Sequence, residues 1–378
     1  MGGAGVSIPA QSGPIAVVVV DDSPVQRRFL RAAVEAEGDF TVVGEARNGR
    51  EAVALVAQLR PAAVLMDLDL PVMSGIEAIE RIMSASPTPI LVYSAFVAGA
   101  NSENALEALA AGAVDVLAKP GPDDTGTLEE YAVALRRKLR VAARVRVITH
   151  PRGRLRTQGM GGAATSLGGG IRRPLTASPL EVDPARGQVR LIAIGSSTGG
   201  PQALLTLLGQ LPRDLLQAVL VVQHMAEGFI PGLASWLDGL VLMPVVVGES
   251  GRRLQPGTIT IAPSGGNLLV QDNRLRVLCT PPEPGQFHVP GIDATFASVA
   301  AALGPDALGV LLTGMGRDGA AGLLAMRERG ALTLGQDEAT SAVYGMPAAA
   351  FTLGAVERQL PLPEIASALL TALGRALA

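Results

Sequence analysis

The sequence predicts an α/β protein with two domains, each built on a parallel sheet, and three observations indicate this. Over residues 15–140, short apolar runs alternate five times with amphipathic stretches, the pattern of parallel strands covered by helices on both faces. Over residues 141–187 this periodicity gives way to Arg, Gly, Thr, Ser and Pro. It returns at LIAIGSSTGG, residues 191–200. We therefore expect domains over 14–140 and 188–376, joined by a flexible linker.

Composition narrows the class of protein. The 378 residues are enough for two or three domains, and the net charge of -3 gives no basic field for nucleic acid. No apolar run reaches the ~18 residues that a membrane span needs, so we expect no membrane insertion. The start of the chain, MGGAGVSIPAQSG, lacks the basic and apolar regions of a secretory signal, and we expect a cytoplasmic protein. The single cysteine, Cys279, excludes an internal disulfide.

In the first domain we expect a (βα)5 doubly wound fold, because strands and helices alternate in order. The predicted strands are the apolar runs at 15–20, 41–46, 63–66, 90–94 and 114–119. The predicted helices follow them, ending near residues 37, 60, 85, 111 and 145. Ser23 and Pro24 are typical of a helix start, and Asn48 with Glu51 resembles a capping box.

Polar residues gather at the carboxyl ends of these strands, where open α/β sheets bind ligands. They are Asp21, Asp22, Asp67, Ser94 and Lys119. Three carboxylates repel one another unless a cation neutralises them, and Mg²⁺ suits such an oxygen site. An aspartate beside Mg²⁺, a lysine and a hydroxyl can accept a phosphoryl group, because the charge on the transferring oxygens is neutralised from several sides. The alternative is that each aspartate only caps the next helix.

The second domain is expected to be a Rossmann-like parallel sheet with a β-hairpin. It opens with strand LIAI, a glycine-rich turn and a helix over 201–211, followed by strand AVLVVQ, residues 218–223. The short runs PVVV, TITIA, NLLV and LRVLC suggest hairpins in the middle region. Helix 292–303, strand 309–314 and helix 320–330 come next. The strand LTLG, a turn around YGMP and a terminal helix complete the chain.

Three residues of this domain form a candidate catalytic constellation. Ser197, His224 and Asp318 each follow a buried-looking strand, so they lie within reach of one another if their strands are neighbours. A serine hydroxyl needs a base at neutral pH, imidazole can supply it, and a carboxylate fixes the imidazole tautomer. Backbone amides near Thr198 and in GMGRDG, which contains Met315, could form an oxyanion hole.

Each of these residues has a plainer interpretation. The turn at Ser197 could cradle a phosphate or be purely structural. His224 could be a hydrogen-bonded core histidine, and His288 in FHVPG is the second candidate for the base. Asp318 could cap its own helix, and Met315 could serve packing alone. The residues by themselves leave these alternatives open.

The first domain resembles response-regulator receiver domains. VVDDSPVQR, MDLDLPVMSG, the serine of VYSA and the lysine of LAKP match the motifs of that family in order, over about the first third of the chain. The resemblance implies that Asp67 is the phosphoacceptor. It also implies that Mg²⁺ is bound by Asp21, Asp22 and Asp67 together with the backbone carbonyl of Asp69.

The same resemblance assigns the remaining receiver residues. Ser94 is the switch hydroxyl, and Lys119 contacts the phosphoryl group. The phosphodonor implied is the histidine kinase of a chemotaxis-type system. One departure concerns Val116, which stands where receivers often carry an aromatic switch residue three positions before the lysine.

The second domain resembles the catalytic domain of the protein-glutamate methylesterases and glutamine deamidases of bacterial chemotaxis. The segments that match are IGSSTGGP, VVQHM, LLTGMGRDGAAGLLAM and QDEATSAVYGMP. This resemblance implies that Ser197 is the nucleophile, His224 the base and Asp318 its orienting carboxylate. The amide of Met315 contributes to the oxyanion hole. The family often has alanine where this chain has Ser196, and basic residues and a serine where it has Val289–Ile292.

Together the two resemblances imply a phosphorylation-activated serine hydrolase. It would remove γ-methyl esters from glutamates of a methyl-accepting chemotaxis receptor, and also deamidate glutamines, giving sensory adaptation. The receiver would occlude the Ser197 site until Asp67 is phosphorylated, and the catalytic domain would need no cofactor. The alternative is a catalytically silent receptor-binding module controlled by phosphorylation. A nucleic-acid output domain is disfavoured, because the sequence has no helix-turn-helix pattern and no basic recognition helix.

Overall fold

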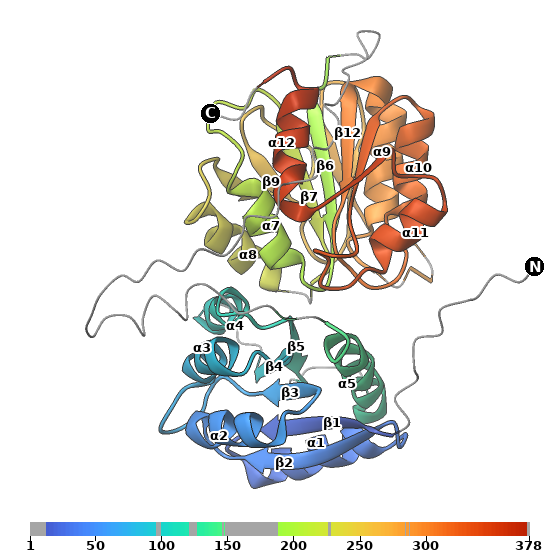
Figure 1. The fold of residues 1–378 in the computed structure, drawn as a ribbon. Coiled ribbons are helices and arrows are strands. Elements are labelled where there is room, and N and C mark those ends of the chain that lie inside the picture. The colour runs from blue at the N-terminus through green and yellow to red at the C-terminus, as the bar shows by residue number, and fades with distance from the viewer. Residues whose placement is uncertain are drawn as a thin grey trace, which may run out of the picture. The chain divides into compact units, whose positions relative to one another are not determined.

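The computed structural model describes residues 13–95, 100–120, 127–145, 147, 188–225, 228–283, 285–286 and 288–375. These form two compact units, each with its own parallel sheet (Figure 1). The predicted linker over 141–187 lies almost entirely outside the described residues. None of the described helices is both long and apolar enough to cross a bilayer.

The first unit is built on a five-stranded parallel sheet in the order β2-β1-β3-β4-β5, which confirms the predicted doubly wound fold. Its strands are β1 Ile15–Val20, β2 Phe40–Ala46, β3 Ala63–Met66, β4 Ile90–Ala95 and β5 Asp115–Lys119. The helices that lie between and after these strands along the chain are α1 Pro24–Glu35, α2 Gly49–Leu59, α3 Gly75–Ala85, α4 Ala100–Ala110 and α5 Leu128–Ala142. Helices α1 and α5 pack together on one face of the sheet, and α2 and α3 on the other.

Local capping explains where these helices begin. The Ser23 hydroxyl accepts from the backbone N–H of Gln26, and Pro24 opens α1. At α2, Asn48 caps as predicted, but Glu51 accepts from the backbone N–H of Arg47, one residue earlier than a capping box requires. A complete capping box occurs at α5 instead.

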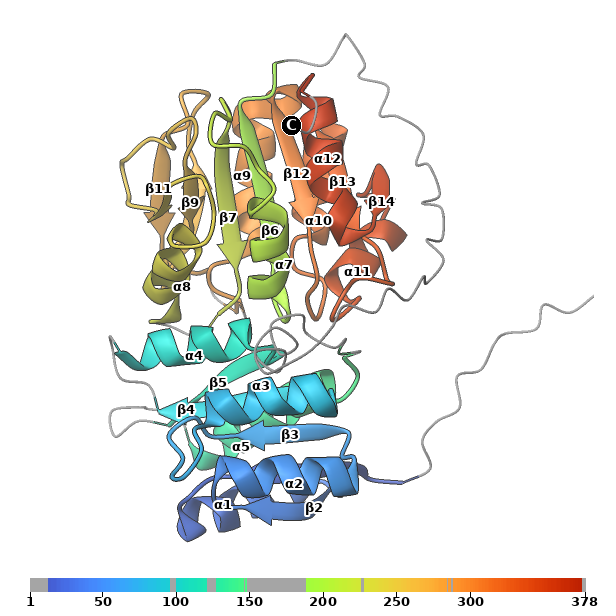
Figure 2. The same ribbon diagram turned by 60° about the vertical axis from the view of Figure 1, so that its left-hand side comes forward.

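The second unit contains a seven-stranded parallel sheet in the order β14-β13-β12-β6-β7-β9-β8, and a separate hairpin (Figure 2). The strands of the sheet are β6 Leu191–Ser196, β7 Ala218–Gln223, β8 Val245–Val247, β9 Ile259–Ile261, β12 Ala307–Leu311, β13 Leu332–Gln336 and β14 Arg358–Leu360. The antiparallel hairpin joins β10 Asn267–Val270 to β11 Val277–Thr280. The predicted Rossmann-like sheet with one hairpin is therefore confirmed.

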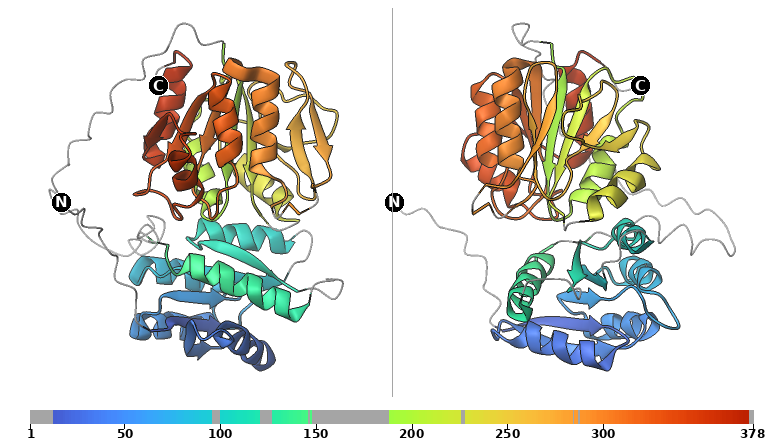
Figure 3. Two further views of the ribbon diagram at one scale, coloured as in Figure 1. Left: turned by 90° about the vertical axis from the view of Figure 1, so that its right-hand side faces the viewer. Right: turned by 180° about the vertical axis from the view of Figure 1, so that it is seen from behind.

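Helices cover both faces of this sheet. They are α7 Gly200–Leu208, α8 Phe229–Asp238, α9 Ile292–Leu303, α10 Ala320–Glu328, α11 Met346–Thr352 and α12 Leu362–Ala372, with a short 3-10 turn at Gly304–Asp306. Helices α7 and α12 pack together on one face, and α9, α10 and α11 on the other (Figure 3). The core consists of buried aliphatic side chains from the strands and from the helices that cover them, together with Phe296 and Met326.

Two parts of the second unit differ from the prediction. PVVV and TITIA do not form hairpins, because β8 and β9 join the edge of the main sheet in parallel. Parallel strands need a long connection to return the chain to the same end of the sheet. The eleven residues between β8 and β9 provide it, whereas a tight turn would not. The turn around YGMP is followed by α11 and β14, which the sequence analysis missed. These elements are only seven and three residues long, too short for a periodic signal.

Candidate functional site

The structure brings Ser197, His224 and Asp318 to the carboxyl ends of neighbouring strands in the larger sheet. Ser197 follows β6, His224 follows β7, and Asp318 lies in the loop between β12 and α10. Strand β6 pairs with β7 on one side and with β12 on the other, all in parallel. The condition set by the sequence, that these strands be neighbours, is therefore met.

His224 and Asp318 are joined by a hydrogen bond. The distance from His224 Nε2 to Asp318 Oδ2 is 2.7 Å, and the two side chains are only 8% and 14% exposed. Burial alone would raise the pKa of Asp318, but the hydrogen bond and charge of His224 and two backbone N–H groups lower it to about 2. The carboxylate is therefore ionised at neutral pH. His224 Nδ1 is buried and has no hydrogen-bond partner in the described part of the chain, so it is the ring nitrogen available for another proton.

Asp318 is also held by the start of α9. Its oxygens accept from the backbone N–H groups of Ile292 at 2.8 Å, Asp293 at 2.9 Å and Gly319 at 3.0 Å. In return, Asp293 Oδ1 accepts from the backbone N–H of Gly322, in the first turn of α10, at 2.7 Å. The two helices thus exchange N-terminal caps. The plainer interpretation, that Asp318 caps its own helix, is too narrow, because it chiefly caps α9 while bonding His224.

The turn that carries Ser197 is tied to the loop after β12. The backbone N–H of Ser197 donates to Thr313 O at 3.0 Å, and Thr313 Oγ1 donates to Thr198 O at 3.0 Å. A Cβ built at Gly314 would lie 2.7 Å from the Cβ of Ser197, so only glycine allows this approach. Ser197, Thr198 and the chain leading into Met315 are therefore brought together.

A segment that the sequence analysis read as a turn closes around this loop. The backbone N–H groups of Gly345 and Met346 donate to Gly314 O at 3.1 and 2.8 Å, and the N–H of Gly314 donates to Val343 O at 3.0 Å. These bonds fix the peptide that precedes Met315. The sequence signal was present, because QDEATSAVYGMP is one of the segments that carried the resemblance.

His288, the second candidate for the base, packs against the first. The two imidazole rings are stacked with centroids 4.5 Å apart and planes 8° from parallel. Its loop is held by Gln286, whose side chain exchanges hydrogen bonds of 2.8 and 2.9 Å with that of Asn267. His288 therefore covers one face of the His224 ring, while the edge of that ring bonds Asp318.

Four buried polar side chains underlie the site at the ends of adjacent strands, and sequence reasoning gave them no role. They are Gln223, Ser196, Thr313 and Gln336, each at most 1% exposed. Ser196 Oγ donates to Gln223 Oε1 at 2.6 Å, and the N–H of Thr313 donates to Gln336 Oε1 at 2.8 Å. A polar residue that ends an otherwise apolar strand is the signal that could have identified them.

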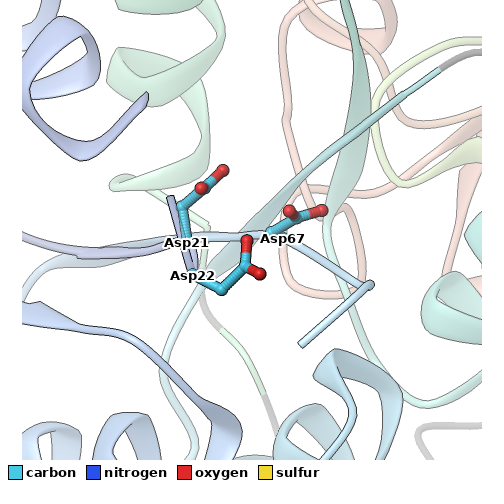
Figure 4. Close-up of side chains that lie close together, drawn as sticks. All are labelled: Asp21, Asp22 and Asp67. Carbon is cyan, nitrogen blue, oxygen red and sulfur yellow. The ribbon is translucent and has the colours of Figure 1, made fainter. Parts of the chain in front are cut away.

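The first unit brings together the predicted acidic residues. Asp21 and Asp22 follow β1, Asp67 follows β3, and ligand oxygens of the three lie within 4.8 Å of one another (Figure 4). Lys119 Nζ lies 3.0 Å from Asp21 Oδ2 and 2.6 Å from Asp67 Oδ2. The aspartates therefore do more than cap helices.

Electrostatics in this cluster favours a cation. Burial raises the pKa of Asp67, the charge of Asp21 raises it further, and Lys119 only partly opposes this. Burial would lower the pKa of Lys119, but its ion pairs with the two aspartates raise it overall. The excess negative charge and an all-oxygen donor set fit a hard divalent cation such as Mg²⁺.

The other predicted receiver residues lie on the neighbouring strands. Ser94 is buried near the end of β4 and pairs in register with Ala118 of β5, next to Lys119. Asp69 follows Asp67 closely, and its side chain is exposed. Val116 is buried in β5, as an aliphatic side chain in this position should be.

An aromatic group does lie beside the cluster, although it does not come from position 116. The ring centroid of Tyr93, on β4, is 5.0 Å from Lys119 Nζ. The same ring packs against Tyr131 of α5 at 6.0 Å, and Tyr131 packs against Phe29 of α1 at 6.3 Å. The sequence analysis did not single out these residues.

The folds and the two sites define a class of protein: an α/β domain with a cluster of three aspartates and a lysine, joined to a second α/β domain in which Ser197, His224 and Asp318 follow neighbouring strands. The family model described as response regulator receiver domain matches residues 17–129, and the one described as CheB methylesterase matches residues 192–369. A protein-glutamate methylesterase/protein-glutamine glutaminase of Paramagnetospirillum magneticum is 43% identical, over 97% of this chain and 98% of that one. One from Anaeromyxobacter dehalogenans is 40% identical, over 96% and 98%.

The chain belongs to the protein-glutamate methylesterase/protein-glutamine glutaminase family. Among solved structures, it is similar to the CheB methylesterase catalytic domain of Thermotoga maritima. The identity there is 31% and the TM-score 0.46, with 47% of this chain and 95% of that one covered.

Proposed function

We propose that this chain hydrolyses glutamyl γ-methyl esters on methyl-accepting chemotaxis receptors and deamidates glutamines at such sites. Relatives at about 40% identity over nearly their full length bear the names of these two activities. The observation that carries the proposal is the 2.7 Å bond between His224 Nε2 and Asp318 Oδ2, next to the strand that Ser197 follows. Because the phosphodonor kinases of such pathways are intracellular, we place the reaction in the cytoplasm.

In this mechanism His224 Nδ1 accepts the Ser197 hydroxyl proton as Ser197 Oγ attacks the ester carbonyl. Asp318 fixes the tautomer, since its bond to Nε2 keeps a proton there and leaves Nδ1 as the base. The backbone amides of Met315 and Thr198 stabilise the oxyanion. Methanol leaves with the proton from His224, and water then hydrolyses the acyl-enzyme. With glutamine as substrate, ammonia leaves instead.

The first unit regulates this reaction through phosphorylation of Asp67 by a histidine kinase. Asp21, Asp22 and Asp67, with the backbone carbonyl of Asp69, would hold Mg²⁺, which neutralises charge on the transferring phosphoryl oxygens. Lys119 pairs with the phosphoryl group and Ser94 is the switch hydroxyl. Phosphorylation relieves occlusion of the Ser197 site by the receiver domain.

Methanol release from methylated receptor membranes, with and without a small-molecule phosphodonor, tests the proposal. We expect release that rises with phosphodonor and is abolished by Ser197→Ala, with unchanged circular dichroism. Ser367→Ala, the same substitution in α12, is the matched control and should keep full activity. Unchanged activity of Ser197→Ala would remove Ser197 as the nucleophile. Phosphodonor-dependent receptor binding by folded protein without methanol release would favour the binding-module alternative.

A further inference from the structure

The side chain of Gln223, the last residue of β7, makes three hydrogen bonds at the carboxyl end of the sheet. Its Oε1 accepts from Ser196 Oγ at 2.6 Å. Its Nε2 donates to the backbone carbonyls of Ser197 at 2.9 Å and of His224 at 2.8 Å. The side chain is 1% exposed, so water does not compete for these groups.

The orientation of this carboxamide is fixed by its partners. Carbonyl oxygens only accept hydrogen bonds, so the NH₂ group must face Ser197 O and His224 O. The amide oxygen then faces Ser196, whose hydroxyl donates to it. A flipped amide would leave both carbonyls without this donor in a buried environment, which is costly. The hydroxyl of Ser196 therefore helps to fix the orientation of the Gln223 carboxamide.

The carboxamide extends the pairing of β6 and β7 beyond the end of their ladder. The strands pair up to Ser196 and Gln223, and the backbone N–H of His224 donates to Ser196 O at 3.0 Å. One residue further on, the two chains leave the sheet, and Gln223 Nε2 bonds the peptide of each. A Cβ at Gly200 would lie 2.0 Å from Gln223 Oε1, so the carboxamide can take this position only with glycine where α7 begins.

We propose that Gln223, oriented by Ser196, is a positioning residue that sets the spacing between Ser197 and His224. The proposal rests on the proposed function, because it assigns the nucleophile and base to these two residues. The carboxamide is rigid and planar, and it bonds both backbone carbonyls directly. Losing it lets the two turns relax separately, and a misplacement of about 1 Å between reacting groups can cost about 100-fold in rate.

The test compares the same substitution at the two ends of one strand. Gln223→Met keeps the volume and removes all three bonds at the carboxyl end of β7. Gln217→Met, one residue before the amino end of β7, removes a 3.2 Å bond to Val189 O far from the site, and is the matched control. The measurements are kcat and KM for methanol release, and the rate at which a fluorophosphonate probe labels Ser197 without receptor.

We expect Gln223→Met to lower kcat and the labelling rate by about 100-fold, with KM unchanged, and Gln217→Met to change neither. A loss of stability alone would lower the melting temperature without changing the labelling rate well below it. Unchanged kcat and labelling in folded Gln223→Met would overturn the proposal. If that variant does not fold, Ser196→Ala decides: a smaller loss in both rates supports the proposal, and none overturns it. A wild-type protein that neither labels nor releases methanol contradicts the proposed function instead.

Discussion

Replacing Asp318 by asparagine should reduce both stability and activity, and the structure gives the size of the first effect. The pKa of Asp318 is about 2, compared with 3.8 for an ordinary aspartate, and its side chain is only 14% exposed. Since one pKa unit corresponds to about 1.36 kcal/mol, the folded state stabilises the ionised carboxylate by roughly 2 kcal/mol. Asp318→Asn keeps the shape but loses the charge, so we expect the catalytic unit to lose about that much at pH 7.

The pH dependence follows from the sign of the change. A lowered pKa means that the folded protein binds the proton more weakly than the unfolded chain does. The stabilisation is therefore fully present above pH 4 and is lost as the pH falls towards 2. The difference between wild type and Asp318→Asn should shrink over the same range.

Denaturant unfolding monitored by tryptophan fluorescence is the appropriate assay. The single tryptophan, Trp236, lies in α8, so its signal reports on the catalytic unit without the receiver. Asp272→Asn is the control, since the side chain of Asp272 is 39% exposed and its carboxylate also accepts backbone N–H groups, in the β10–β11 turn. We also expect kcat for methanol release to fall on the order of 10⁴-fold in Asp318→Asn, because the tautomer of His224 is no longer fixed. Equal stability of wild type and Asp318→Asn at pH 7 would refute the reasoning.

Three further predictions concern other residues. Asp293→Ala removes the cap on α10 and should lower the free energy of unfolding, followed at Trp236, by about 1 kcal/mol. Asp293→Asn keeps an acceptor for the backbone N–H of Gly322 and should lower it less, so equal losses would argue against a capping role. Asp67→Asn should make methanol release the same with and without phosphodonor, and a retained response would exclude Asp67 as the phosphoacceptor. Lys119→Met should raise the pKa of Asp67 further, because Lys119 opposes the effect of burial. The measurement is an NMR titration of the carboxyl groups without Mg²⁺, and an unchanged Asp67 pKa in the variant would show that the ion pair is unimportant.

Most of the fold could be predicted because its signals are local. Apolar runs located the principal strands, and caps such as Ser23 and Asn48 located helix starts. Whether β8 and β9 join the main sheet depends on which distant strand they pair with, and a three-residue apolar run does not specify that partner. Short elements such as α11 are stabilised mainly by tertiary contacts, so local pattern is a poor guide to them.

The candidate site divides in the same way. The sequence predicted that Ser197, His224 and Asp318 follow strands, but their meeting depends on β6 lying between β7 and β12. The bonds from Ile292 and Asp293 to Asp318 cross 26 and 25 residues of sequence, so spacing could not reveal them. Likewise, an aromatic ring does lie beside Lys119, but it comes from Tyr93 on β4 and not from position 116.

The row of Gln223, Ser196, Thr313 and Gln336 has a consequence for the solvent in the site. Where parallel strands stop pairing, their peptide groups would ordinarily turn to water. In this protein side-chain carboxamides and hydroxyls act as substitute peptide groups, and all four side chains are at most 1% exposed. The polar groups at these strand ends are therefore shielded from water, and the low exposure of His224 and Asp318 strengthens their interaction. In the proposed mechanism, the water that hydrolyses the acyl-enzyme therefore does not enter through these strand ends.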